Sequence, residues 1–306
     1  MGVSSTKHEL NKVIESEDSS VSDYFSLLKP RVMSLAIFTS IIGLSLAPGT
    51  LHPFLSFVSI ICISLGAGCC AAINMWYDRD IDSKMERTKN RAIPLGKIDS
   101  SNVLGFGILL GVTGLILLGL AVSYFAAFLL GFSIFFYIVI YTMWLKRSTH
   151  HNIVIGGAAG AFPPVIGWAC VTNDISLFPV ILFLIIFFWT PPHFWSLALF
   201  KDTEYSKVNI PMLPVKYGKK NTKIQILIYS FILFFISSLP YIMGLTTKIY
   251  FIVSCFLNLI FVFGAVDLMN SNSKNSDKKA SFLFKYSIIY LYILFLSVLF
   301  DKNFAL

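Results

Sequence analysis

Asn74, Asp78 and Asp82 recur every four residues near the end of the second long apolar stretch of the chain. Four residues turn an α-helix by about 400°, so the three side chains would share one face and span about 12 Å of axis. Two carboxylates at this pitch repel each other unless a cation lies between them. Amide and carboxylate oxygens suit Mg²⁺, which often shares its shell with substrate phosphates. The spacing therefore predicts a magnesium site formed by Asn74, Asp78 and Asp82.

Basic residues follow these acids and recur after the fourth apolar stretch. An Arg guanidinium binds two phosphate oxygens at once, and a Lys ammonium supplies a point charge. A solvated helix end with local ion pairs is the structural alternative for the acidic segment, and a topology signal is the alternative for the basic pair. We expect Lys146 to act in catalysis and the arginines to bind a diphosphate; these are Arg87, Arg91 and Arg147.

The composition is that of a polytopic membrane protein. Hydrophobic residues make up 56% of 306 positions, and charged residues make up 13%, about half the level of a soluble domain. Mean hydropathy is +0.75. A helix needs about 20 apolar residues to cross a bilayer. Nine such spans are predicted, at residues 30–48, 53–76, 103–121, 123–142, 152–171, 175–198, 224–243, 247–268 and 282–300.

The basic residues predict the orientation of this all-α bundle. Of the 24 Lys and Arg, 22 fall in the tail or in the connections after spans two, four, six and eight when residues at span edges are counted with them, and only Lys248 and Lys302 fall on the other side. The positive-inside rule then places the amino terminus in the cytoplasm and the carboxyl terminus outside. Topology accounts for the net charge of +8, so nucleic-acid binding is not expected.

A single transmembrane domain is expected over residues 26–306, after a disordered cytoplasmic tail at residues 1–25. The tail is polar and rich in acids, which argues against a cleaved signal or transit peptide. A bacterial inner membrane is the expected location. The long, charged connections lie on the cytoplasmic side, so any chemistry is expected to face the cytoplasm.

A second acidic segment follows the sixth span. Asp202, Glu204 and Tyr205 precede a stretch rich in Pro, Gly and Lys, as the first acids do. Two acidic segments on one membrane face would clamp a metal-bound phosphate group between them. Asp202 and Glu204 are therefore candidate metal ligands, and all three residues are candidates for substrate binding.

The run WTPPHFW, residues 189 to 195, is unusual inside a span. Two prolines remove backbone donors, so we expect the helix to break there. His193 is an ionisable residue within the membrane and a functional candidate, although a buried histidine is often only a structural hydrogen-bonding group. Trp189 and Tyr141 are candidates to present their ring faces to a cation.

These parts together suit a prenyl diphosphate. Its diphosphate needs a metal and basic side chains, whereas its isoprenoid tail partitions into an apolar bundle. Magnesium would stabilise the leaving diphosphate as the C–O bond breaks, and aromatic rings would stabilise the allylic cation without trapping it.

Four sequence runs carry a family resemblance. The run NMWYDRDIDSKMERTKNR resembles the first aspartate-rich motif of the UbiA superfamily of intramembrane prenyltransferases. More narrowly, three runs resemble the protoheme IX farnesyltransferases of that superfamily, and the likeness covers residues 29 to 229. The three runs are YTMWLKRSTHHNIVIGGAAGAFPPVIGWA, WTPPHFWSLAL and NIPMLPV.

The resemblance implies a nine-helix bundle that joins the farnesyl group of farnesyl diphosphate to a vinyl carbon of heme b, with water completing the product. It implies Mg²⁺ at the first motif and diphosphate contacts from the basic residues. Relatives commonly carry an Asp-Tyr pair where this chain has Glu204-Tyr205, so the second acidic site departs from the family pattern. From the residue itself, His193 is a candidate heme ligand, with His150 and His151 as rivals. Product would pass to heme A synthase or to a terminal oxidase under assembly.

Two other functions remain open at this point. A prenyltransferase that acts on an aromatic quinone precursor would share the metal site but would need no heme-sized cavity. A transporter would need polar groups across the bilayer centre, whereas the charges here gather at one surface.

Overall fold

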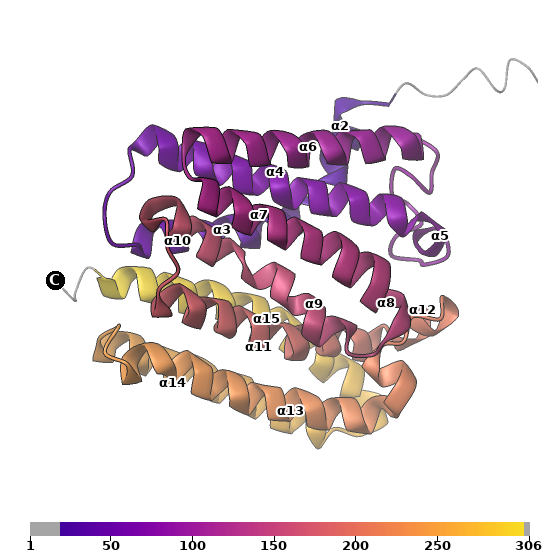
Figure 1. Ribbon diagram of the computed structural model, residues 1–306. Coiled ribbons are helices and arrows are strands. Elements are labelled where there is room, and N and C mark those ends of the chain that lie inside the picture. The colour runs from indigo at the N-terminus through magenta and orange to yellow at the C-terminus, as the bar shows by residue number, and fades with distance from the viewer. Residues whose placement is uncertain (1–18, 303–306) are drawn as a thin grey trace, which may run out of the picture.

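The structure is a computed structural model that describes residues 19–302, except for the side chains of Asp202, Ser273 and Lys274. Every regular element within that range is a helix (Figure 1). In chain order the helices are α2 (Val21–Leu27), α3 (Pro30–Leu46), α4 (Pro53–Tyr77), α5 (Arg79–Asp82), α6 (Ser100–Ala121), α7 (Tyr124–Phe135), the π-helix η1 (Phe136–Leu145), α8 (Lys146–Ser148), α9 (Asn152–Ala161), α10 (Pro163–Thr172), α11 (Leu177–Phe200), α12 (Asp202–Lys207), α13 (Leu213–Ile242), α14 (Lys248–Met269) and α15 (Ser273–Lys302).

The long helices run side by side across one bundle (Figure 1). Within residues 19–302, eight helices are long and apolar enough to cross a membrane, and the pair α2 and α3, bent by 57°, makes a ninth. The span between residues 124 and 148 combines α7, η1 and α8, and the next combines α9 and α10. The all-helical bundle and its apolar spans confirm the fold predicted from hydropathy.

Glycines allow the closest helix approach in the bundle. A Cβ at Gly43 of α3 would overlap the backbone carbonyl of Pro164 in α10, and a Cβ at Gly167 would overlap the carbonyl oxygen of Ser40. Backbone contact of this kind is the usual use of small residues between membrane helices. It fixes α3, whose amino-terminal end lies at the site described below, against α10.

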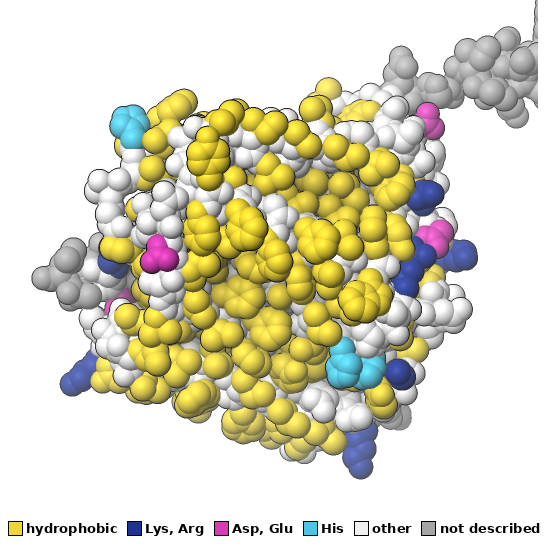
Figure 2. All heavy atoms as spheres, in the orientation of Figure 1, with side chains coloured by type: hydrophobic (Ala, Val, Ile, Leu, Met, Phe, Trp, Pro, Cys, Tyr) yellow, Lys and Arg dark blue, Asp and Glu magenta, His cyan; other side chains and the backbone are white. Residues whose placement is uncertain are grey.

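On the face shown in Figure 2, apolar side chains cover the middle of the molecule, and charged side chains gather toward its two ends. The end that carries α5, α8 and α12 is opposite the end where the carboxyl terminus lies (Figure 1). This distribution is the one that a bilayer requires, because a charge within the hydrocarbon layer is unfavourable.

The tail and the seventh span differ from the sequence-based expectations. The tail predicted to be disordered includes helix α2, which begins with a capping box between Ser20 and Asp23; residues 1–18 lie outside the described residues. The element α13 (Leu213–Ile242) contains a kink at Gly218, whose φ of 78° and ψ of 165° are not helical, so a short helical segment at residues 213–217 precedes the seventh span.

The predicted break at Pro191 and Pro192 is wrong. Helix α11 runs from Leu177 to Phe200 with both prolines inside it. Both prolines are buried, and α11 packs against α9, α13 and α15. Neighbouring helices on several sides hold α11 together where two of its own backbone hydrogen bonds are missing.

Candidate active site

The first acidic motif lies where α4 ends. Asp78 caps α4 and leaves the helical conformation, and α5 carries Asp82. Backbone hydrogen bonds still link residue 78 to 74 (3.0 Å) and residue 82 to 78 (2.8 Å), so the four-residue spacing survives the break. Asn74 donates from Nδ2 to Asp78 Oδ2 at 2.9 Å. All three side chains are buried at one end of the bundle.

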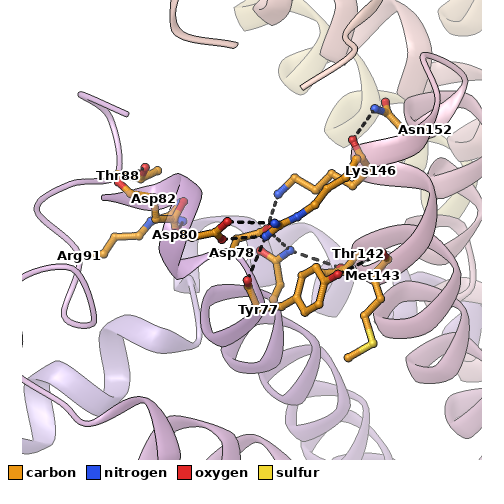
Figure 3. Close-up of polar contacts among 12 residues, drawn as sticks. Tyr77, Asp78, Asp80, Asp82, Thr88, Arg91, Thr142, Met143, Lys146 and Asn152 are labelled. Atoms are coloured by element: carbon orange, nitrogen blue, oxygen red, sulfur yellow. Dashed lines mark hydrogen bonds and ion pairs between the residues drawn. The ribbon is translucent and has the colours of Figure 1, made fainter. Parts of the chain in front are cut away.

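Each member of this motif is paired with a cation from a different element. Lys146, at the start of α8, donates to Asp78, and Arg91 donates from Nη1 to Asp82 Oδ2 at 2.5 Å (Figure 3). Lys29, between α2 and α3, donates from Nζ to Asn74 Oδ1 at 2.9 Å. Thr88 also anchors the segment, since its hydroxyl donates to the carbonyl oxygen of residue 82 at 2.9 Å.

Arg147 holds the next carboxylate. Its guanidinium donates twice to Asp80, at 2.8 and 3.0 Å, and once to the carbonyl oxygen of Tyr77 at 3.1 Å. It also lies 4.7 Å from the centre of the Tyr77 ring and 3.5 Å from Asp78 Oδ1. The Arg147 hydrogen bonds hold the pKa of Asp80 below its usual value. The predicted basic pair is therefore at the first acidic motif.

The π-helix η1 shapes the opposite wall of this site. In a π-helix the N–H bonds the carbonyl five residues back, and Lys146 N–H accordingly donates to the Tyr141 carbonyl. Thr142 accepts a hydrogen bond from Asn74 at 3.3 Å. The rings of Tyr137 and Tyr141 lie 5.4 Å apart, and the Tyr141 ring fills the space where a Cβ at Gly156 would be. Isolated π turns often occur at functional sites, and this one spans ten residues.

Helix α12 brings the second acidic segment to the same end. Burial raises the pKa of Tyr205, and the positive charges of Arg87 and Lys146 oppose that shift, so both cations lie near its phenol. A cavity of about 170 Å³ separates residues 80 and 81 from residues 207–210. Glu204 is largely buried and pairs with Lys201 at 2.7 Å. The side chain of Asp202 lies outside the described residues, so its predicted role stays a prediction.

His193 and Trp189 lie between α11 and α15. The His193 ring stacks between Trp189 and Phe284, with ring centroids 4.3 and 4.6 Å away. Its Nδ1 shares a 2.6 Å hydrogen bond with the Ser287 hydroxyl, and the Trp189 indole donates to the Ser287 carbonyl at 2.8 Å. These contacts hold both rings at the helix interface, and none of them reaches the acidic motif.

The residues present fit a divalent cation. Across the described part of the chain, no three His, Cys, Asp or Glu side chains form a ready metal cluster; the candidate set here consists of two acids, each paired with a cation, and the amide of Asn74. Two buried acceptors nevertheless lack a hydrogen-bond partner, Asp78 Oδ1 and Glu204 Oε2. The Arg147 contact at 3.5 Å is a long ion pair without hydrogen-bond geometry, so Asp78 Oδ1 retains unused acceptor capacity. Oxygen donors of this kind suit Mg²⁺.

Sequence reasoning missed Lys29 and the π-helix. The position of Lys29 directly before Pro30 was visible in the sequence, but Lys29 was counted only among the basic residues that predict membrane orientation. Arg87 was predicted to bind diphosphate, and its side chain is exposed. Within residues 19–302 it forms no hydrogen bond or ion pair, so it is available to a ligand.

Comparison with known proteins gives one family. Residues 36–289 match the model of the UbiA prenyltransferase family. The chain is 50% identical over 290 residues to a protoheme IX farnesyltransferase of Granulibacter bethesdensis, covering 93% of this chain and 92% of that protein. It is 51% identical over 278 residues to one of Rickettsia bellii, covering 91% and 92%.

Solved structures share the fold at lower identity. A digeranylgeranylglyceryl phosphate synthase superposes with a TM-score of 0.76 and 20% identity, over 92% of this chain and 98% of that one. A UbiA homologue from Archaeoglobus fulgidus, bound to DMAPP and Mg²⁺, superposes with a TM-score of 0.68 and 14% identity, over 90% and 99%. The family match, the close relatives and the shared fold agree, and the chain belongs to the UbiA prenyltransferase family.

Proposed function

We propose that this chain transfers the farnesyl group of farnesyl diphosphate to a vinyl group of heme b, giving heme O and inorganic diphosphate. The observation that carries the proposal is the identity of about half of all aligned residues with protoheme IX farnesyltransferases over nearly the whole chain. The buried cluster of acids and cations at the end of an apolar bundle is the site that such a reaction needs.

Asn74, Asp78 and Asp82 would hold Mg²⁺, and Glu204, with Asp202, would supply further ligands from α12. When bound, Mg²⁺ would neutralise part of the charge that develops on the leaving diphosphate. The unpartnered oxygens of Asp78 and Glu204 support this assignment, because a buried acceptor without a partner is unfavourable until a cation or donor reaches it.

The basic side chains would hold the diphosphate. Arg87 is exposed, and Arg91, Lys146 and Arg147 are bonded to carboxylates that a metal would bind or neighbour. When the metal binds those carboxylates, diphosphate oxygens would replace them as partners of the basic side chains. Every charge would then stay paired with an opposite charge while the substrate binds. Tyr205, near Arg87 and Lys146, would donate its phenol hydrogen to a phosphate oxygen.

The transfer step needs an electrophilic carbon and no protein nucleophile. The C–O bond of farnesyl diphosphate breaks, and its electron pair leaves with the diphosphate. The allylic cation adds to the outer vinyl carbon of heme b, water adds to the inner vinyl carbon, and that water loses a proton. The rings of Tyr137 and Tyr141, beside the acidic motif, would stabilise the cation through their π faces.

His193 would bind or orient the porphyrin. Its Nδ1 is engaged by Ser287, which leaves Nε2 as the nitrogen for the heme iron. Replacement of His193 by Ala should therefore weaken heme b binding more than diphosphate binding. An equal fall in both affinities, measured on purified protein, would give His193 a structural role only.

The active site would face the cytoplasm of a bacterial inner membrane. The distribution of Lys and Arg along the sequence supports this orientation. Heme O released there would pass to heme A synthase or to a terminal oxidase.

The test supplies purified protein with isotope-labelled farnesyl diphosphate, Mg²⁺ and either heme b or an aromatic acid. We expect label in heme O, detected by mass spectrometry, and none in the acid. Prenylation of the acid alone would refute the heme assignment and would leave a quinone-precursor prenyltransferase. A matched Asp78→Asn reaction shows whether any product arises at the site described here.

A further inference from the structure

Lys29 stands at a strained bend in the backbone. It connects α2 and α3, which meet at 57°, and its φ of 50° and ψ of 61° are left-handed. Residues other than glycine rarely adopt this conformation, and the following Pro30 disfavours it further. Strain of this kind persists only where the surrounding structure imposes it, and it concentrates at functional sites.

Helix α2 is fastened on the far side of this bend. Its capping box joins Ser20 and Asp23, and Leu27 is fully buried. The Tyr24 ring meets the edge of the Phe106 ring in α6 with centroids 5.1 Å apart. With α2 held in this way, the partly buried Lys29 side chain is directed into the acidic site, where its ammonium reaches Asn74.

Lys29 occupies the one ligand atom that Asn74 can offer a metal. The Asn74 amide nitrogen donates to Asp78 at 2.9 Å and to Thr142 at 3.3 Å, so its orientation is fixed. The amide oxygen therefore points to Lys29, at 2.9 Å. An ammonium and a divalent cation repel each other strongly at such distances, so they cannot share this oxygen.

We propose that Lys29 is a placeholder for the metal: it holds Asn74 Oδ1 in the unliganded protein and moves to the diphosphate when the metal binds. The inference rests on the metal and diphosphate roles assigned under the proposed function. It gives α2, which lies outside the family motifs, a direct part in substrate loading.

The charges explain why such a device is useful. In the unliganded site four cations surround two buried carboxylates, Asp78 and Asp82; they are Lys29, Arg91, Lys146 and Arg147. A divalent cation that enters alone adds charge to a site that already has four cations. A cation that enters with diphosphate brings the anion that these side chains then bind. Lys29 therefore couples metal binding to diphosphate binding. The affinity for each ligand depends on whether the other is bound, and this dependence is a coupling free energy.

The test measures binding rather than turnover. Purified wild type, Lys29→Met and Lys29→Arg are titrated with Mn²⁺ alone, and then with inorganic pyrophosphate in the presence of Mn²⁺. Free Mn²⁺ is followed by electron paramagnetic resonance, and pyrophosphate by calorimetry. Arg31→Met is the matched control, because Arg31 is an exposed cation two residues away.

Loss of the ammonium should have opposite effects on the two ligands. In Lys29→Met, Mn²⁺ alone should bind about tenfold tighter and pyrophosphate about tenfold weaker, the size of one charge-assisted hydrogen bond. Lys29→Arg should stay nearer the wild type, and Arg31→Met should match it.

Unchanged Mn²⁺ affinity in Lys29→Met would overturn the proposal. A parallel loss of both affinities in Lys29→Met and Lys29→Arg would also overturn it, because Lys29 would then serve only the fold. Neither titration uses heme or farnesyl transfer, so failure of this inference and failure of the proposed function are separate results.

Discussion

Two buried polar clusters in this bundle differ in charge and in completeness. The cluster at α4, α5 and α8 consists of Asn74, two carboxylates and their cations, and it leaves an oxygen of Asp78 without a hydrogen bond. The cluster within α13, α14 and α15 is neutral. There Asn258 donates to the Ser237 hydroxyl at 2.8 Å and accepts from Tyr290 at 3.0 Å.

This difference suggests separate roles: function for the charged cluster and stability for the neutral cluster. A neutral network with satisfied donors and acceptors fixes the register of helices in an apolar environment. Buried charges are expensive, and an incomplete charged cluster is a poor stabilising device. We therefore expect the charged cluster to exchange partners when a ligand binds, and the neutral cluster to keep its hydrogen bonds.

Loss of charge at the first cluster should have the largest effect. Asp78→Asn keeps the shape but removes the charge that would hold the metal, so we expect the rate of farnesyl transfer to fall by about 10³-fold. The rate is measured by following product formation with mass spectrometry. The control is Asp267→Asn, an exposed carboxylate paired with Lys279. A wild-type rate in Asp78→Asn would remove the metal site.

A cation at the rim should matter less. Arg87 is exposed and makes no ion pair within the described residues, so its removal leaves no buried charge behind. Arg87→Ala should raise the KM for farnesyl diphosphate by about tenfold, with a much smaller change in kcat. Arg79→Ala, whose guanidinium lies 5.3 Å from the Trp76 ring, is the control. Equal kinetics in both variants would contradict a diphosphate role for Arg87.

A substitution in the neutral cluster should lower the stability of the fold and leave the rate of farnesyl transfer unchanged. Asn258→Ala removes the hydrogen bonds to Ser237 and Tyr290, and a buried bond in a membrane bundle contributes about 1 kcal/mol. We expect a lower Tm and an unchanged kcat for the folded fraction. Asn272→Ala, at an exposed position, provides the comparison. A loss of kcat without a loss of Tm would break the distinction between the two clusters.

The smallest effect concerns the exposed edge of the charged cluster. Arg147 lowers the pKa of Asp80, so their pair stabilises the fold above the unfolded-state pKa of about 4 and that stability is lost as pH falls through the lower folded-state pKa. Thermal unfolding of wild type and Asp80→Asn should differ slightly at pH 7 and converge in strong acid, because exposed pairs contribute little. A difference that grows as the pH falls would contradict this.

Much of the fold was predictable because a bilayer imposes a length on apolar segments. The spans found by hydropathy correspond to the helices, but charged helical extensions carry no such signal. A short helical segment therefore precedes the kink at Gly218 in α13, and α2 begins within the expected tail and ends beyond it, at Leu27. Pro191 and Pro192 predicted a break from local chemistry, and packing against three neighbouring helices prevents it.

The site residues that could be predicted are those whose spacing along the chain indicates a shared chemical role. Asn74 and Asp78 are hydrogen-bonded at the end of α4, Asp82 follows on α5 with its backbone bonded to residue 78, and Lys146 was visible as a cation on the same face. Lys29 was not identified, because a lysine before a span is a common topology signal. Its bend, like the π-helix at residues 136–145, depends on packing between distant segments.

The central claim is that acids at the end of the bundle hold a metal that allows the diphosphate to leave. The most direct test follows heme O formation by purified wild type from farnesyl diphosphate and heme b, first with a chelator and then with Mg²⁺ restored. We predict no product with the chelator and recovery of the full rate with Mg²⁺. Product formation at an unchanged rate in the chelator would contradict the account.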